Sequence, residues 1–189
     1  MQVGSGPRPL RQGDTSLASK TSPPADREPT ASRPHMPGYG ISPASAEGDL
    51  LPWSWAVQRL EQAHNYWLAT SRPDRSPHLA AVWGVWVDGA LHFSTGGGSR
   101  KARNLATDPR CAVTPEQAGE AVVLEGVAER VTGPRELARI LSAYRRKYGS
   151  EFPDPAENPV FAVHPRTVFG VIEHEPEFSS KATRWVFAS

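Results

Sequence analysis

The sequence is poor in cysteine and has no long apolar run. Cys111 is the single cysteine among 189 residues, which excludes an intramolecular disulfide framework and a cysteine-based zinc finger. No apolar run approaches the roughly 20 residues that a membrane helix needs, so we expect a soluble protein without a membrane partner. The segment from Met1 to Pro9 lacks the continuous apolar core of a secretory signal, which predicts a cytoplasmic location.

The sequence also lacks a dominant charge. Lys and Arg number 21 against 20 Asp and Glu, and the formal net charge of +1 excludes a strongly basic nucleic-acid binder. His64, His164 and His174 show no metal-ligand spacing with one another or with Cys111, so we expect no metal site. The 19 prolines and 16 glycines are many for a helical protein and indicate short strands and turns.

The first 45 residues are predicted to be a disordered N-terminal extension, followed by one domain over residues 46–189. Residues 1–35 contain no aromatic residue and six prolines. Such a segment does not bury enough surface to offset roughly 1–2 kcal/mol of ordering entropy per residue. Two interpretations stay open: a genuine flexible tail, or a natural chain that starts at Met36.

From Leu51 onward the pattern changes to short strands joined by turns. Asp88-Gly89 is a strong hairpin signal, and Gly84 predicts a bulge or a place where a ligand meets the backbone. Hairpins outnumber helical crossovers, which favours a small β-barrel with helices packed outside it. The predicted helices cover 53–63, 99–105 and 134–148, and the predicted strands cover 66–70, 77–87, 90–95, 110–114, 121–131, 160–163 and 167–172.

The segment around residues 93–103 is the most informative for chemistry. A strand ends in Ser94 and Thr95, passes through three glycines, and enters a helix with Ser99 as its N-cap and two adjacent cations, Arg100 and Lys101. Helix-start amides favour an anion, and Arg grips phosphate oxygens in a bidentate manner. Arg103 lies on a nearby face of the same helix. The residues alone leave two interpretations open: a phosphate site, or a solvated basic helix.

Several segments together resemble the pyridoxamine 5′-phosphate oxidase-like flavin-binding split barrels. The resemblance runs over about residues 51–187. The segments that carry it are Tyr66-Trp67-Leu68-Ala69-Thr70 with Arg72-Pro73-Asp74 and Pro77-His78, then Val82 to Gly89, Phe93-Ser94-Thr95, Ser99-Arg100-Lys101, Asn104-Leu105 and Asp108-Pro109-Arg110.

This resemblance implies a six-stranded split β-barrel, mainly β with a few packed helices, that forms a homodimer. It implies a bound FMN or F420 at the dimer interface, with no catalytic side chain named by the sequence. By resemblance, Arg100 and Lys101 bind the ribityl phosphate, Ser94 and Thr95 touch the cofactor, and a C-terminal aromatic lies near the ring. The cofactor-binding residues expected in total are Ala81, Val82, Trp83, Gly84, Ser94, Thr95, Ser99, Arg100, Lys101, Arg103 and Trp185.

Two departures from the family bear on the activity. Leu79 and Gly84 stand where pyridoxamine phosphate oxidases carry basic residues, and the arginine-rich C-terminal segment is missing. We therefore expect a flavin or deazaflavin reductase, which transfers a hydride to a small organic acceptor, rather than a vitamin B6 oxidase. The 17 arginines against 4 lysines indicate high-GC coding, which slightly favours F420. The alternative is a non-enzymatic carrier of flavin, deazaflavin or haem.

Some candidate residues also have an ordinary structural interpretation. His78 and His92 are read as pocket-edge polar residues rather than catalysts, and Cys111 as a small buried hydrophobe. Trp83 and Trp185 either pack in the core or interface or stack on a ring system. The run Arg145-Arg146-Lys147 either interacts with the helix dipole or meets the anionic tail of a deazaflavin coenzyme.

Overall fold

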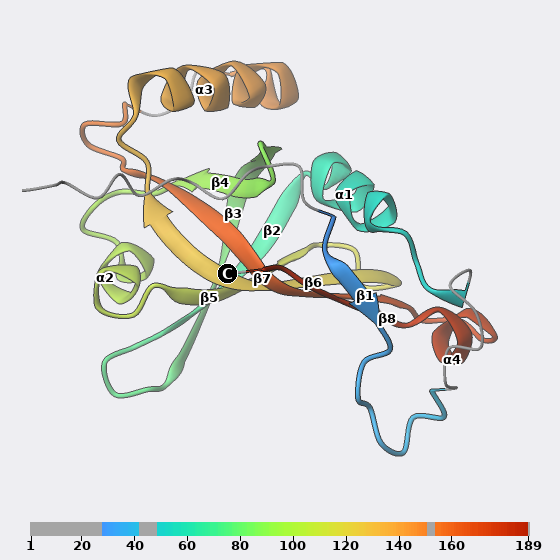
Figure 1. Ribbon diagram of the computed structural model, residues 1–189. Helices are drawn as coiled ribbons and strands as arrows, with labels where there is room; N and C mark the ends of the chain where they lie inside the picture. Colours follow the sequence, from blue (N-terminus) through green and yellow to red (C-terminus); the bar gives the residue numbers. More distant parts are fainter. Residues whose placement is uncertain (1–27, 42–48, 151–153, 189) are drawn as a thin grey trace, which may run out of the picture.

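Six antiparallel strands close a barrel, and the helices pack on its outside (Figure 1). The structure, a computed structural model, describes residues 28–41, 49–150 and 154–188. The order β7-β4-β3-β2-β5-β6 is closed by pairing of β6 with β7, which confirms the predicted mainly β split barrel. The elements are β1 Thr30–Ser32, α1 Trp53–Gln62, β2 Asn65–Ser71, β3 Pro77–Val87, β4 Ala90–Ser94, α2 Arg100–Thr107, β5 Arg110–Pro115, β6 Glu120–Arg130, α3 Pro134–Tyr148, β7 Val160–Ile172, α4 Glu177–Lys181 and β8 Thr183–Val186.

Strand β7 is long enough to pair with three neighbours. One edge pairs first with β4 and then, further along, with β8, while β6 runs along the other edge. The two strands predicted over 160–163 and 167–172 are therefore one strand. Pro165 lies inside it, opposite Gly126 at the irregularity where the β6 register shifts. A Cβ on Gly126 would collide with the His164 carbonyl, so this bulge requires glycine.

The N-terminal segment contributes a strand that the sequence did not reveal. Strand β1 pairs antiparallel with β8 at the edge of the sheet. The Arg33 guanidinium then donates to the carbonyls of Ala182 and Ser180, at 3.0 and 2.5 Å. The expected disorder over residues 1–45 is thus wrong for residues 30–32, while its parts at 1–27 and 42–45 lie outside the described residues.

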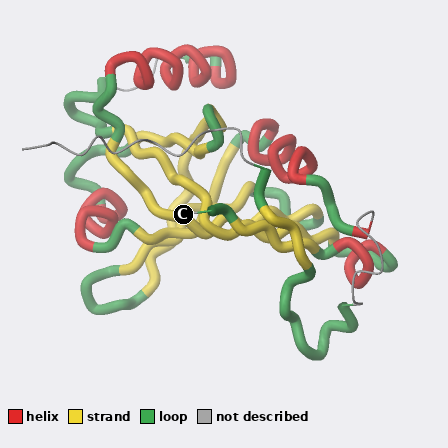
Figure 2. The backbone as a smooth tube through the Cα atoms, viewed as in Figure 1, coloured by secondary structure: helices red, strands yellow, loops and turns green. Residues whose placement is uncertain are grey.

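Two clusters of buried side chains hold the fold together. The larger fills the barrel and includes Tyr66 and Phe93, which are 0% exposed. The smaller lies between the barrel and α3 and contains Val85 and Ile140. Figure 2 shows the helices outside the strands of the barrel. None of the helices in the described ranges is long and apolar enough to cross a membrane.

Candidate cofactor site

The strand end at β4 is locked to the start of α2 by hydroxyl groups. The Ser99 hydroxyl accepts a hydrogen bond from the Ala102 amide at 3.2 Å, which confirms Ser99 as the N-cap. The Thr95 hydroxyl lies 3.0 Å from that of Ser99, and Thr95 is 9% exposed. The Ser94 hydroxyl donates to the Asn158 carbonyl at 3.0 Å. These contacts fix the direction in which the first turn of α2 points.

The first turn of α2 presents cations without counter-ions. Arg100 and Arg103 are exposed and Lys101 is half-buried. Within the part of the chain that the structure describes, none of the three side chains has an ion pair or a hydrogen bond. The amides of Arg100 and Lys101 also have no acceptor inside the helix, as at any helix start. Together these groups form what we call the α2 cradle, a site suited to an anion.

The glycine loop leaves space over this cradle. None of Gly96, Gly97 and Gly98 has a positive φ, so backbone conformation does not require glycine there. A Cβ on Gly98 would meet nothing within 4 Å, and one on Gly96 would lie 3.8 Å from the Asn158 side chain. The missing side chains therefore leave open space, and the cradle fits a ligand phosphate that approaches the backbone closely.

The loop amides contribute less than the sequence suggests. The Gly97 amide donates to the Glu157 carbonyl at 3.3 Å, and the Ser99 amide donates to the Gly96 carbonyl at 2.9 Å. The amides of Gly97 and Ser99 are therefore occupied within the protein, so the side-chain cations carry more of the binding.

Strand β3, the predicted ring-facing strand, lies next to this loop. Gly84 pairs with Phe93, so Trp83 lies beside the end of β4. Ala81 and Trp83 point outward and are exposed, with Trp83 48% exposed and stacked on Tyr148 at 4.8 Å. Val82 points into the barrel and is 6% exposed. The available side chains of this segment are therefore those of Ala81 and Trp83.

Gly84 serves internal packing. A Cβ there would lie 3.0 Å from the His92 carbonyl, and the strand has no bulge at this point. Its amide donates to the Tyr148 hydroxyl at 2.9 Å, and its carbonyl accepts from Lys147 Nζ at 2.9 Å. Trp83 is the last residue of β3 that pairs with β2, so the Gly84 backbone has no partner on β2 and finds its partners on α3 instead. The amide and the carbonyl of Gly84 thus have partners within the protein, and the expected contact of Gly84 with the cofactor stays a prediction.

Trp185 lies apart from the strand end at Ser94. It is 1% exposed, packs edge-on against Trp53 at 5.5 Å, and lies over Gly170, where a Cβ would meet its ring. It pairs with Val168, eight residues along β7 from Val160, the partner of Ser94. At about 3.3 Å per residue this is roughly 26 Å along β7, so the structure does not bring Trp185 together with the strand end at Ser94.

A cluster around Lys147 went unpredicted. Its ammonium donates to the Tyr66 hydroxyl at 2.7 Å and lies 4.8 Å from the centre of the Tyr66 ring. Burial lowers the Lys147 pKa to about 8 and raises the pKa of Tyr66. Lys147 thus turns inward to hold β3, instead of meeting the anionic tail of a coenzyme. The spacing of residues along α3 predicts that the Lys147 side chain lies near the apolar face of the helix. It does not predict the partners of Lys147, because they lie on other elements.

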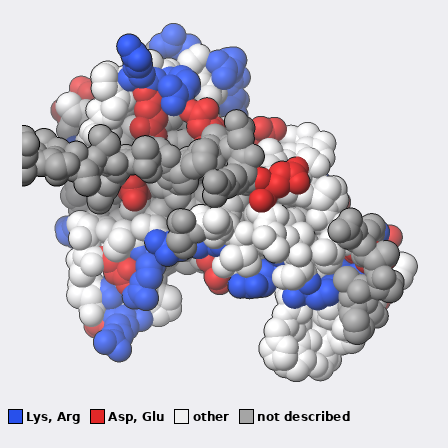
Figure 3. Space-filling view, viewed as in Figure 1, with Lys and Arg blue, Asp and Glu red and all other residues white. Residues whose placement is uncertain are grey.

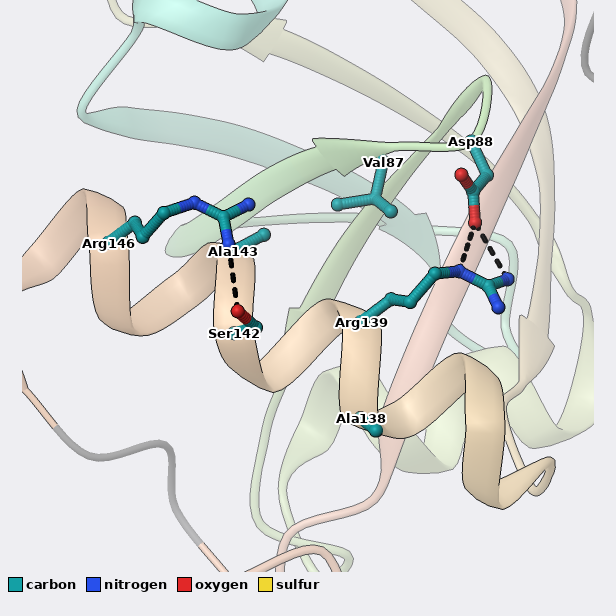
Figure 4. A pocket seen from close by; sticks show the side chains of 7 residues that line it. All are labelled: Val87, Asp88, Ala138, Arg139, Ser142, Ala143 and Arg146. Carbon is teal, nitrogen blue, oxygen red and sulfur yellow. Dashed lines mark hydrogen bonds and ion pairs between the residues drawn. The ribbon is translucent and has the colours of Figure 1, made fainter.

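A second basic region lies over α3. Basic side chains gather on this helix in Figure 3. A groove of about 470 Å³ separates α3 from the β3–β4 hairpin, and Figure 4 shows its lining side chains. Arg139 is paired with Asp88 at 2.8 Å, and Arg146 donates to Ser142 at 2.7 Å. These cations already have partners, so the groove is a poorer anion site than the α2 cradle.

The other candidate residues of the sequence lie in the following surroundings. Cys111 is buried, and burial raises the pKa of its thiol to about 12, in agreement with its interpretation as a small buried hydrophobe. His92 is buried under α3. His78 lies at the start of β3 on the α2 side of the barrel, where the charges of Lys101 and Arg100 help to lower its pKa.

Comparison with known proteins places this chain in a family. Residues 56–172, from within α1 to the end of β7, match the family described as Pyridoxamine 5'-phosphate oxidase. No curated protein matches the chain.

Solved structures share the fold. A heme binding protein from Mycobacterium smegmatis is 23% identical with a TM-score of 0.56, over 67% of this chain and 56% of that chain. A conserved hypothetical protein from Mycobacterium tuberculosis is 26% identical with a TM-score of 0.52, over 68% of this chain and 84% of that chain. A putative pyridoxamine 5'-phosphate oxidase from Listeria innocua is 17% identical with a TM-score of 0.52, over 60% and 93%. The chain spans little more than half of the heme binding protein. With its family match and its six-stranded barrel, this chain belongs to the pyridoxamine 5′-phosphate oxidase family.

Proposed function

We propose that the protein is an oxidoreductase that binds FMN or F420 at the α2 cradle and transfers a hydride to a small organic acceptor. The observation that carries this proposal is the pair of cations Arg100 and Lys101, which have no counter-ion among the described residues, at the helix start of a chain in this family. A bound flavin or deazaflavin supplies the hydride chemistry.

In this proposal the chain's own residues bind and orient the cofactor. Arg100 and Lys101 hold the phosphate by charge-assisted hydrogen bonds, and Ser99 keeps the helix start in place through its cap. Ala81 and Trp83 on the outer face of β3 lie beside the ring. Fixed orientation between cofactor and acceptor provides most of the rate acceleration, so the activity does not require a catalytic triad.

The proposal includes a homodimer with the cofactor at the interface. Trp67, Leu79 and Trp83 are 44%, 61% and 48% exposed, and all three point outward from β2 and β3. Trp67 pairs with Ala81 in register, so these side chains form one apolar face, which we call the β2–β3 face. A partner on this face would bury it and cover the outward side of β3 next to the cradle.

The test is a double substitution in the cradle. Arg100→Ala/Lys101→Ala should weaken FMN and F420 binding by about a hundredfold or more, because each charge-assisted contact contributes about 1.5–3 kcal/mol. Equilibrium titration followed by cofactor fluorescence measures the affinity, and the thermal unfolding midpoint checks the fold. Arg135→Ala, an exposed arginine of α3, is the matched control and should bind as the wild type does.

The outcomes separate the proposal from its alternatives. Equal affinity in the double variant and the wild type would overturn the phosphate assignment. Preference for F420 directs the search to deazaflavin reductases, and preference for FMN to flavin chemistry. Binding without turnover by the reduced cofactor would favour a carrier. Haem binding in place of both would favour the activity that the name of the Mycobacterium smegmatis protein gives.

A further inference from the structure

A titratable group that the proposed function does not use is linked to the helix that carries the α2 cradle. His78, on β3, pairs in register with Thr70 on β2, and its Nδ1 lies 3.4 Å from the Thr70 hydroxyl oxygen. That same oxygen accepts a hydrogen bond from Asn104 Nδ2 at 3.0 Å. Asn104 lies one helical turn beyond Arg100 and Lys101 on α2. The chain Asn104–Thr70–His78 therefore ties the imidazole to the helix that carries the cradle.

The groups around His78 are cationic or neutral. Arg72, in the β2–β3 turn, donates across that turn to the carbonyl of Pro77 at 2.6 Å, which keeps it beside the start of β3. Burial and the charges of Arg72, Lys101 and Arg100 lower the His78 pKa, so the two α2 cations act on the imidazole electrostatically. From β5, Cys111 pairs with Thr70, and burial keeps this thiol neutral.

The nearby carboxylates have other partners. Asp74, in the same turn as Arg72, accepts from the amide and the hydroxyl of Ser76 at 2.9 and 2.6 Å. Asp108, at the end of α2, is paired with Arg110 at 2.7 Å. No carboxylate of the described residues pairs with the cradle cations, so an anion there would relieve the repulsion among them.

We propose that His78 is a further phosphate ligand of the α2 cradle and takes up a proton when a phosphate dianion binds there. This inference rests on the proposed function, because it concerns the phosphate end of the same cofactor. A phosphomonoester carries close to two negative charges at neutral pH, and it would favour a positive imidazole beside it. The Thr70 hydroxyl serves both states, since it rotates to donate to a neutral Nδ1 or to accept from a protonated one.

Because phosphate binding is coupled to proton uptake by His78, the α2 cradle is selective for dianions. A neutral His78 adds little attraction for a ligand without phosphate, whereas a protonated His78 adds a charge to those of Arg100 and Lys101. Affinity for a phosphomonoester should therefore fall as the pH rises through the bound-state titration of His78, beyond any change in the phosphate itself. Riboflavin, which lacks the phosphate, should not show this dependence.

The experiment follows the histidine ring protons by NMR between about pH 5 and about pH 8. The signal missing in His78→Gln identifies His78. Inorganic phosphate should raise its titration midpoint by about one pH unit in the wild type. Arg100→Ala/Lys101→Ala should lose most of this effect. His174, exposed next to Glu173 at the far end of β7, is the internal control whose midpoint should stay unchanged.

A binding measurement accompanies the NMR titration. His78→Gln should weaken FMN binding about tenfold near pH 6.5 and much less near pH 8.5, while riboflavin binding stays equal to that of the wild type. An unchanged His78 midpoint in a protein that binds FMN would overturn this inference and leave the proposed function standing. Weakening by the same factor at both pH values would also overturn it. A raised midpoint in a protein that binds neither FMN nor F420 would support the phosphate site and overturn the proposed function.

Discussion

His92 is a residue whose protonation the fold opposes. It lies on β4 beneath α3 and is 2% exposed. Its Nδ1 has no hydrogen-bond partner among the described residues, and its Nε2 lies 3.7 Å from the Glu136 carboxylate. Burial, reinforced by His164, lowers its pKa to about 4. The neutral imidazole is thus part of the packing between the barrel and α3.

This burial predicts a stability loss in mild acid. Between about pH 6.5 and about pH 4 the unfolded chain binds a proton at His92 that the folded chain does not, so the free energy of unfolding falls as the pH falls. The contribution amounts to about 3 kcal/mol across that window. Urea unfolding of the wild type and of His92→Gln at several pH values measures it. The variant should lose much of the slope, whereas His174→Gln should keep it; equal slopes in wild type and His92→Gln would contradict the assignment.

Local sequence patterns predict the positions of most helices and strands. The helix predicted over 134–148 and the strand predicted over 77–87 have those bounds in the structure, because apolar periodicity and turn residues mark both. The Asp88-Gly89 turn also occurs as predicted, with φ of 50° and 76°. Strand β1 was missed since its three residues carry no apolar alternation and its partner β8 lies about 150 positions away in the chain.

For the candidate site, too, the sequence predicts local features better than contacts between distant residues. The capped start of α2 was predicted because its hydroxyls, glycines and cations are contiguous in the sequence, and a capped helix start is a local structure. The surroundings of Trp185 and Gly84 are set by distant residues: the indole packs against Gly170 and Trp53, and the Gly84 carbonyl accepts a hydrogen bond from Lys147. Local sequence does not encode such pairings.

Strand β1 is expected to stabilise the edge of the sheet at β8. A variant that begins at Met36 loses β1 and the two hydrogen bonds of Arg33, and it leaves the outer edge of β8 unpaired. We expect it to be less stable by about 1–3 kcal/mol than a variant that begins at Glu28, which retains them. Urea unfolding of the two variants gives the difference. Coincident unfolding curves would show that β1 adds no stability.

Within the part of the chain that the structure describes, the barrel has one apolar face that no other element covers. The β2–β3 face exposes Trp67, Leu79 and Trp83, whereas β4 and the end of β3 are covered by α3. Large contiguous apolar areas of this kind are typical of interfaces. Tyr39, also exposed, lies apart from this face and contacts Phe178 of α4.

This face predicts an assembly that a single charge disrupts. We expect the wild type to sediment as a dimer of the 20.6 kDa chain, and Leu79→Glu to sediment as a monomer, because a carboxylate buried opposite apolar side chains costs several kcal/mol. Tyr39→Glu, which adds the same charge elsewhere, should remain dimeric. Sedimentation velocity distinguishes these states. Since the cradle lies beside this face, the monomeric variant should also bind FMN and F420 more weakly than Tyr39→Glu does. A wild type that sediments as a monomer, and still binds FMN or F420 as tightly as Tyr39→Glu does, would refute the interface. It would also show that binding at the cradle does not depend on assembly.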